Sequence, residues 1–134
     1  MNRRFLRPGL ILLTVFAVIV GAWALFSPRS FYDDFPGGDR AWVSALPPYN
    51  EHLVRDVGAL NLAVGLMVGG AAYYMERRLT MVALLAYLVY SVPHFFFHMF
   101  HLDELSDSDK ILQTASLAFT VVLPVYLLAL NRRT

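Results

Sequence analysis

Four long apolar segments constrain this chain more than any other feature. They cover roughly residues 8–26, 53–74, 79–98 and 111–130. Because a helix rises about 1.5 Å per residue, about 20 apolar residues cross a hydrocarbon core that is about 30 Å thick. With 57% hydrophobic residues, the composition is also too apolar for an ordinary soluble domain. The sequence therefore predicts an all-α fold: a polytopic membrane protein whose single domain, residues 1–134, is an antiparallel bundle of four transmembrane helices.

The distribution of basic residues predicts the orientation of this bundle. Arginines precede the first segment, fill the turn between the second and third, and end the chain; they are Arg3, Arg4, Arg7, Arg77, Arg78, Arg132 and Arg133. Basic residues that flank transmembrane helices stay in the cytoplasm. We therefore expect a multi-pass protein of the cytoplasmic membrane, with both termini cytoplasmic and all four histidines at the extracytoplasmic end.

The first apolar segment has a second interpretation. An arginine-rich start and the sequence "AWA" at Ala22–Ala24 are also typical of a cleaved signal peptide. The apolar run is long for such a peptide and continues through Phe26. These features favour an uncleaved transmembrane helix.

The connection from residue 27 to residue 50 is long for a helical bundle and rich in aromatic residues. Aromatic rings with a polar edge suit the headgroup region of a membrane. We expect two short helical pieces, roughly residues 30–35 and 39–46, separated by Pro36-Gly37-Gly38. Asn50 is the predicted N-cap of the second long helix, and Ser106 or Asp107 caps the last one.

Each long segment carries one face of small or polar residues. In the third segment this face includes Tyr87, Tyr90, Ser91, His94 and His98; in the others it includes Thr14, Ala17, Gly21 and Ala24, then Gly58, Asn61, Gly65 and Gly69, and finally Gln113, Ser116, Thr120 and Pro124. Small residues permit close approach of membrane helices, and polar residues bond between them. We expect these faces to point into the bundle.

Three histidines in "VPHFFFHMFHLDE" raise the question of a metal site. His94, His98 and His101 lie on successive turns of one predicted helix, and His52 and Asp56 lie four residues apart on another. Imidazole and carboxylate ligands suit zinc, iron, manganese or copper. The candidate metal ligands are therefore His52, Asp56, His94 and His98, and a histidine from each helix would also suit haem. The alternative is that these histidines only meet lipid headgroups where their helices leave the membrane.

A second set of residues suits an organic cofactor. Tyr87, Tyr90 and His94 form a polar stripe that fits a quinone ring, with hydrogen bonds to its carbonyl groups. Arg55 is the candidate clamp for an anionic group. The alternatives are hydrogen bonds between helices for the tyrosines and, for Arg55, a side chain that snorkels to the outer interface. Glu51, four residues away, can also form an ion pair with Arg55.

Several classes of function are excluded or weakly supported. Cysteine is absent, which removes disulfides, iron–sulfur clusters and thiol catalysis. A net charge of +1 with scattered basic residues argues against nucleic acid as a partner. The chain has no nucleophile motif, no HExxH and no phosphate loop, so the question of enzyme activity stays open.

The favoured function is a binding or redox-accessory protein for a metal ion, haem or quinone at an extracytoplasmic-facing pocket. One alternative is a structural or assembly subunit of a larger membrane complex. Another is a membrane enzyme that modifies a lipid or isoprenoid, resting on His52, Arg55, Asp56 and Tyr90. Expected partners are membrane lipids and either another membrane protein or further copies of this chain.

The run "SPRSFYDDFPGGDRAWVSALPPYNEHLVRDVGALNLA" resembles a segment of uncharacterised bacterial four-helix membrane proteins and is similar to the DoxX-like group. The resemblance covers the first outer loop and the first half of the second long helix, and the four-crossing plan extends it over the chain. It implies a small polytopic protein of the bacterial cytoplasmic membrane. The three-histidine stretch lies outside the resemblance.

Overall fold

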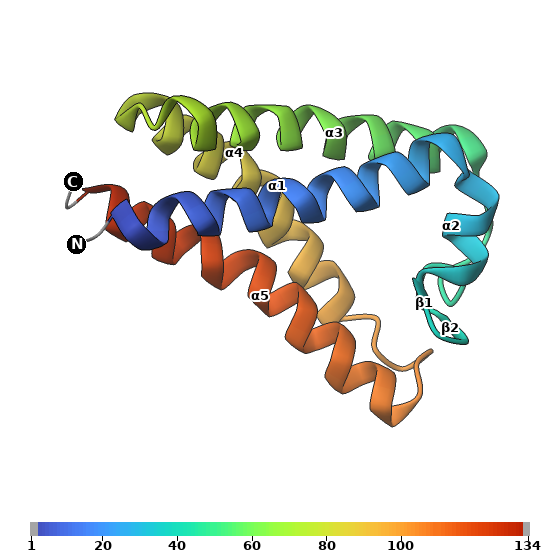
Figure 1. Cartoon of the computed structure of the whole chain (residues 1–134). Coiled ribbons are helices and arrows are strands. Elements are labelled where there is room, and N and C mark those ends of the chain that lie inside the picture. Colours follow the sequence, from blue (N-terminus) through green and yellow to red (C-terminus); the bar gives the residue numbers. More distant parts are fainter. Residues whose placement is uncertain (1–2, 133–134) are drawn as a thin grey trace.

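The computed structural model describes residues 3–132, which form a predominantly helical fold (Figure 1). In chain order the elements are α1 (Arg3–Phe26), α2 (Pro28–Asp34), β1 (Pro36–Gly37), β2 (Arg40–Ala41), α3 (Glu51–Tyr74), α4 (Arg77–Met99) and α5 (Asp107–Arg132). Within the described residues, α1, α3, α4 and α5 are long and apolar enough to cross a membrane. The all-α prediction and its four long helices are confirmed, and each helix begins two to five residues earlier than expected.

The four long helices form two pairs that diverge. α1 packs most extensively on α3, and α4 on α5. The pairs meet at one end of the molecule and spread apart toward the other (Figure 1). We call the first the arginine end, because it holds the start of α1, the α3–α4 turn and the end of α5; its arginines are Arg4, Arg7, Arg77, Arg78 and Arg132. The other is the loop end, which holds α2, β1, β2 and the α4–α5 connection.

The α1–α3 pair is built on small residues that allow main-chain contact. A Cβ atom added at Gly58 would lie 2.5 Å from the Leu25 nitrogen and 2.8 Å from the Gly21 carbonyl oxygen. Further along the pair, Gly65 faces Ala17 and Gly69 faces Thr14. The small faces of these two helices therefore point inward, as the sequence predicts, and they pack on each other.

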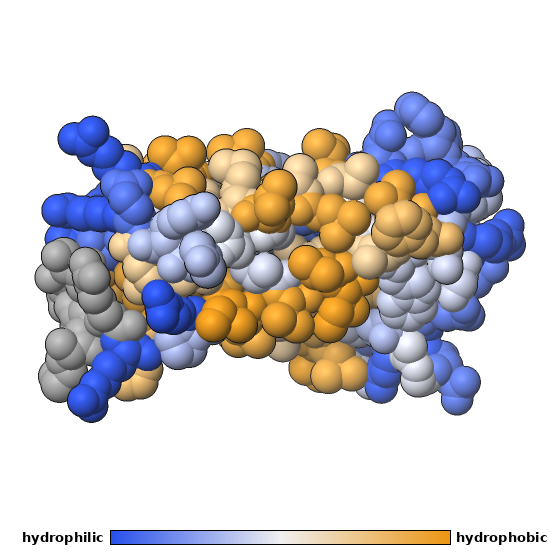
Figure 2. Space-filling model, turned by 45° about the horizontal axis from the view of Figure 1, so that its top comes forward, coloured by the Kyte–Doolittle hydropathy of each residue, from blue (hydrophilic) through white to orange (hydrophobic). Residues whose placement is uncertain are grey.

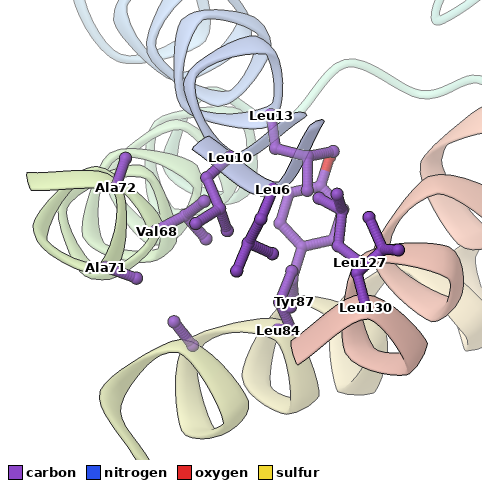
Figure 3. Close-up of a cluster of buried hydrophobic side chains, with 11 residues drawn as sticks. Leu6, Leu10, Leu13, Val68, Ala71, Ala72, Leu84, Tyr87, Leu127 and Leu130 are labelled. Carbon is purple, nitrogen blue, oxygen red and sulfur yellow. The ribbon is translucent and has the colours of Figure 1, made fainter. Parts of the chain in front are cut away.

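The larger core cluster lies where the two helix pairs meet. Leu10 and Leu13 of α1, Leu84 of α4 and Leu127 of α5 are almost fully buried there, and the ring of Tyr87 lies among them (Figure 3). Tyr87 is only 3% exposed. It is therefore a core residue of the arginine-end half of the molecule.

The connection between α1 and α3 differs from the prediction in its second half. The first expected helical piece is present as α2. The second, over residues 39–46, is wrong: β1 and β2 form a short antiparallel hairpin, with Pro36 opposite Ala41, followed by turns. The physical reason is the backbone at the hairpin turn, where Gly37, Gly38 and Asp39 all have positive φ angles, a region incompatible with a right-handed helix.

Side-chain caps define three of the helix starts. Asn50 Oδ1 accepts a hydrogen bond from the Leu53 N–H (3.0 Å), and Ser106 Oγ accepts one from the Asp109 N–H (3.2 Å), so both predicted caps are confirmed. At the start of α4, the Glu76 carboxylate accepts from the N–H groups of Arg78 and Leu79. These bonds, the Leu79 bond above all, hold the pKa of the Glu76 carboxyl below its usual value.

Candidate functional site

The polar face of α4 is turned toward the neighbouring helices. Tyr87 and Ser91 are buried, and Tyr90, His94 and His98 are half-buried. Their spacing of three or four residues keeps them on one side of the helix. The predicted inward direction of this stripe is therefore confirmed, although its Tyr87 end lies inside the apolar core.

Three rings of the stripe form a continuous column toward the loop end. Tyr90 stacks on His94 with 5.3 Å between ring centroids and an interplanar angle of 19°. His94 meets His98 edge to face, with the centroids 4.6 Å apart. We call Tyr90, His94 and His98 the ring column. It is the part of the stripe that combines aromatic surface with hydrogen-bonding nitrogen and oxygen atoms.

Residues from two other helices flank the ring column. Asn61, on α3, lies next to Tyr90. Asn61 also donates from Nδ2 to the Val57 carbonyl oxygen at 2.9 Å, which fixes its orientation. On α5, Gln113 is 3% exposed and interacts with His98. The ring column thus has an amide side chain from α3 near Tyr90 and one from α5 near His98.

Two polar atoms beside the ring column have unused hydrogen-bonding capacity. Ser91 Oγ and Gln113 Oε1 are buried and lack a partner of good geometry among residues 3–132. A buried polar atom without a partner costs about 1–3 kcal/mol. Both atoms are enclosed by the protein, so they mark a local cost in the packing around the ring column.

The predicted pair on α3 forms, but on an exposed surface. His52 Nε2 lies 3.4 Å from Asp56 Oδ2, and the two side chains are 88% and 57% exposed. Arg55 lies between them in sequence and donates to Glu51 Oε1 at 2.8 Å and to the Leu25 carbonyl. The predicted ion pair with Glu51 is confirmed, and Arg55 links the start of α3 to the end of α1.

The candidate metal ligands are brought together only as two separate pairs. His52 lies beside Asp56, and His94 lies beside His98. Among residues 3–132 no three His, Asp or Glu side chains are grouped so that they could hold a metal ion. His101 is exposed, stacks on Phe97 and bonds to its carbonyl through Nδ1 at 2.7 Å. A four-ligand metal centre therefore stays a prediction.

The hairpin is tied to α5 by a cluster that we call the clamp: Arg40, Trp42, Ser106 and Asp109. The Asp109 carboxylate accepts hydrogen bonds from Trp42 Nε1 (2.8 Å), from Ser106 Oγ (2.7 Å) and from the Arg40 guanidinium. The clamp joins the two helix pairs at the loop end, where they are furthest apart (Figure 1). From the sequence, Asp109 is expected only to complement the positive dipole end of the last helix, because nothing local relates it to residues as distant in the chain as Arg40 and Trp42.

Comparison of the chain with protein-family models, with curated proteins and with solved structures finds no match. The similarity to the DoxX-like group therefore stays a prediction from the sequence.

Proposed function

We propose that this chain is an integral protein of the bacterial cytoplasmic membrane that binds a quinone at the ring column, in a binding or redox-accessory role. The membrane location is supported by the four long apolar helices and by the hydrophobic band between two hydrophilic ends in Figure 2. The grouping of arginines at one end supports cytoplasmic termini. In that orientation the ring column lies in the extracytoplasmic half of the bilayer.

The arrangement of Tyr90, His94 and His98 between Asn61 and Gln113 is the observation that carries the proposal. A quinone has a flat apolar ring that stacks on aromatic side chains and two carbonyl oxygens that accept hydrogen bonds. The column offers ring surface, a phenol donor and imidazole nitrogens, and the flanking amides add donors. The ring column contains no arginine, lysine or carboxylate, and the lack of charge suits a neutral ligand inside the membrane.

Metal and haem fit the same residues less well. A metal ion needs three or more protein ligands in most sites, and no such group is found among residues 3–132. A bis-histidine haem needs two imidazoles on opposite sides of the iron. His94 and His98 lie on one face of one helix, and His52 is 88% exposed elsewhere. We therefore prefer the quinone among the three ligands that the sequence suggests.

The other two candidate functions lack a specific observation in their favour. A structural subunit would use its small-residue faces to bind other helices, but Gly58, Gly65 and Gly69 of α3 already contact α1. A lipid-modifying enzyme would need Arg55 free to hold a substrate, but Arg55 bonds to Glu51 and to Leu25.

Quinone binding is tested by titrating the purified full chain in mild detergent with decylubiquinone. We expect one saturable site, and Tyr90→Phe and His94→Phe should each raise Kd about fivefold to tenfold, since each removes one hydrogen bond worth about 1 kcal/mol. Tyr73→Phe is the matched control, because Tyr73 is 78% exposed on α3. Absence of saturable binding, or an unchanged Kd in both variants, would refute the proposal. Stoichiometric bound metal lost in His94→Phe would support the metal site instead.

A further inference from the structure

An open groove runs between α1 and α3 near the arginine end, away from the ring column. Its volume is about 440 Å³. It is lined by Arg7, Ile11, Thr14 and Val15 of α1 and by Gly69, Ala72 and Tyr73 of α3. Four residues of helix rise about 6 Å, so Arg7, Ile11 and Val15 follow one another along one side of α1, from charged to apolar.

At the groove, Gly69 lets α3 come close to Thr14 of α1. A Cβ atom there would lie 3.1 Å from Thr14 Cγ2, whereas one at the neighbouring Gly70 would meet nothing within 4 Å. The Thr14 hydroxyl donates to the Leu10 carbonyl oxygen at 2.8 Å, so its hydrogen-bonding demand is met inside α1. The inner part of the groove therefore presents hydrocarbon surface and suits an alkyl chain.

One cation, Arg7, lines the groove. Arg7 is exposed and has no ion pair or hydrogen bond within residues 3–132. The acid in the α3–α4 turn, Glu76, is engaged by the N–H groups of Arg78 and Leu79. The groove thus brings the Arg7 guanidinium, which has no partner among residues 3–132, together with an apolar channel. Tyr73 also lines it, and aromatic residues are enriched where membrane helices meet lipid headgroups.

We propose that this groove binds one anionic phospholipid of the cytoplasmic leaflet. The phosphate accepts hydrogen bonds from Arg7, and one acyl chain lies along Ile11, Val15 and Gly69. Guanidinium groups recognise phosphate through paired donors, and an anionic headgroup adds charge complementarity that a zwitterionic lipid lacks. The proposal goes beyond quinone binding and shares with it only the location of the chain in a bilayer.

Native mass spectrometry of the full chain in a neutral detergent tests the lipid site. The chain is titrated with dioleoylphosphatidylglycerol and separately with dioleoylphosphatidylcholine, and we expect the first phosphatidylglycerol to bind more tightly. Arg7→Gln should weaken that binding about fivefold, the effect expected for one basic residue at a membrane surface. Arg78→Gln is the charge control, because Arg78 is exposed at the same end but does not line the groove.

A second pair of variants tests the shape of the groove. Gly69→Ala narrows the groove and should weaken phosphatidylglycerol binding, whereas Gly70→Ala points into open space and should leave it unchanged. Equal affinity for the two lipids, or equal losses in Arg7→Gln and Arg78→Gln, would overturn the proposal even if Gly69→Ala folds poorly. Decylubiquinone titration of Arg7→Gln separates the two sites. Unchanged quinone binding together with lost lipid selectivity supports the lipid site. Loss of both quinone binding and lipid selectivity would point to general misfolding and would overturn the assignment of Arg7.

Discussion

Trp42 and Asp109 are 67 residues apart in sequence and are joined by a 2.8 Å hydrogen bond from the indole N–H to the carboxylate. This bond belongs to the clamp that ties the β1–β2 hairpin to the first turn of α5. Trp42 is 9% exposed, and its own backbone N–H donates to the Phe35 carbonyl at 2.8 Å. The hairpin and the start of α5 should therefore open together when the indole bond is removed.

The first prediction concerns this clamp. Trp42→Phe keeps an aromatic ring but removes the N–H donor, so the hairpin should open about fivefold more often, as expected for the loss of one hydrogen bond of about 1 kcal/mol. Hydrogen exchange at the residue 42 amide, measured by mass spectrometry, should rise accordingly. Trp23→Phe is the control, since Trp23 Nε1 bonds to Ser30 and not to the clamp. Equal exchange in the two variants would show that the indole bond does not hold the hairpin.

The second prediction concerns the main-chain contact between α1 and α3. In Gly58→Ala the new methyl group would meet the Leu25 nitrogen at 2.5 Å, and backbone cannot move aside as a flexible side chain can. We expect the free energy of unfolding to fall by about 1–3 kcal/mol. Unfolding in mixed micelles with increasing dodecyl sulfate, followed by circular dichroism, measures it. Gly70→Ala should unfold like the parent chain, and a similar stability of both variants would contradict this account of the interface.

The third prediction concerns pH and the cap of α4. Because the pKa of Glu76 is lowered in the folded chain, the ionised carboxylate stabilises the fold above the ordinary glutamate pKa of 4.5, and this contribution is lost as the pH falls through the folded pKa. Glu76→Ala should therefore have a lower Tm than the parent at pH 7, with the gap closing below about pH 4.5. If the difference in Tm between the parent and Glu76→Ala stays constant from pH 7 to pH 3, the charge of the Glu76 carboxylate contributes nothing to stability.

The fourth prediction concerns orientation. The chain has no cysteine, so single cysteines can be introduced without background labelling. Glu104→Cys lies in the exposed α4–α5 connection and Arg78→Cys in the exposed start of α4. In intact cells we expect a membrane-impermeant maleimide to label the position 104 variant, and the position 78 variant only after permeabilisation. The opposite pattern would invert the proposed topology.

Hydropathy and local chemistry predicted most of the fold. The apolar segments, the caps at Asn50 and Ser106, and the small faces of α1 and α3 all follow from spacing along single helices. The hairpin could not be predicted in this way. Its turn has three successive residues with positive φ, and turn geometry, not helix propensity, determines that backbone conformation. Residues 39–46 contain good helix formers, and the turn geometry outweighs them.

The site was predicted only as far as one helix determines it. The α4 stripe follows from helical periodicity, but its neighbours Asn61 and Gln113 depend on how α3 and α5 are rotated. The rotation of α3 also determines that His52 is exposed. Once Gly58 and Gly65 face α1, the periodicity of 3.6 residues turns His52 and Asp56 to another side of α3, where both are exposed.

The contact at Gly21 and Gly58 also sets how this interface can change during evolution. In most packed interfaces a larger residue on one side is offset by a smaller one on the other, which produces covariation between the two positions. Here each added methyl group would meet main-chain atoms of the opposite helix, and both residues are already the smallest possible. A substitution at one position can therefore not be offset by a substitution at the other. Among descendants of this chain each glycine should be retained independently, so that no covariation between the two positions reveals their contact.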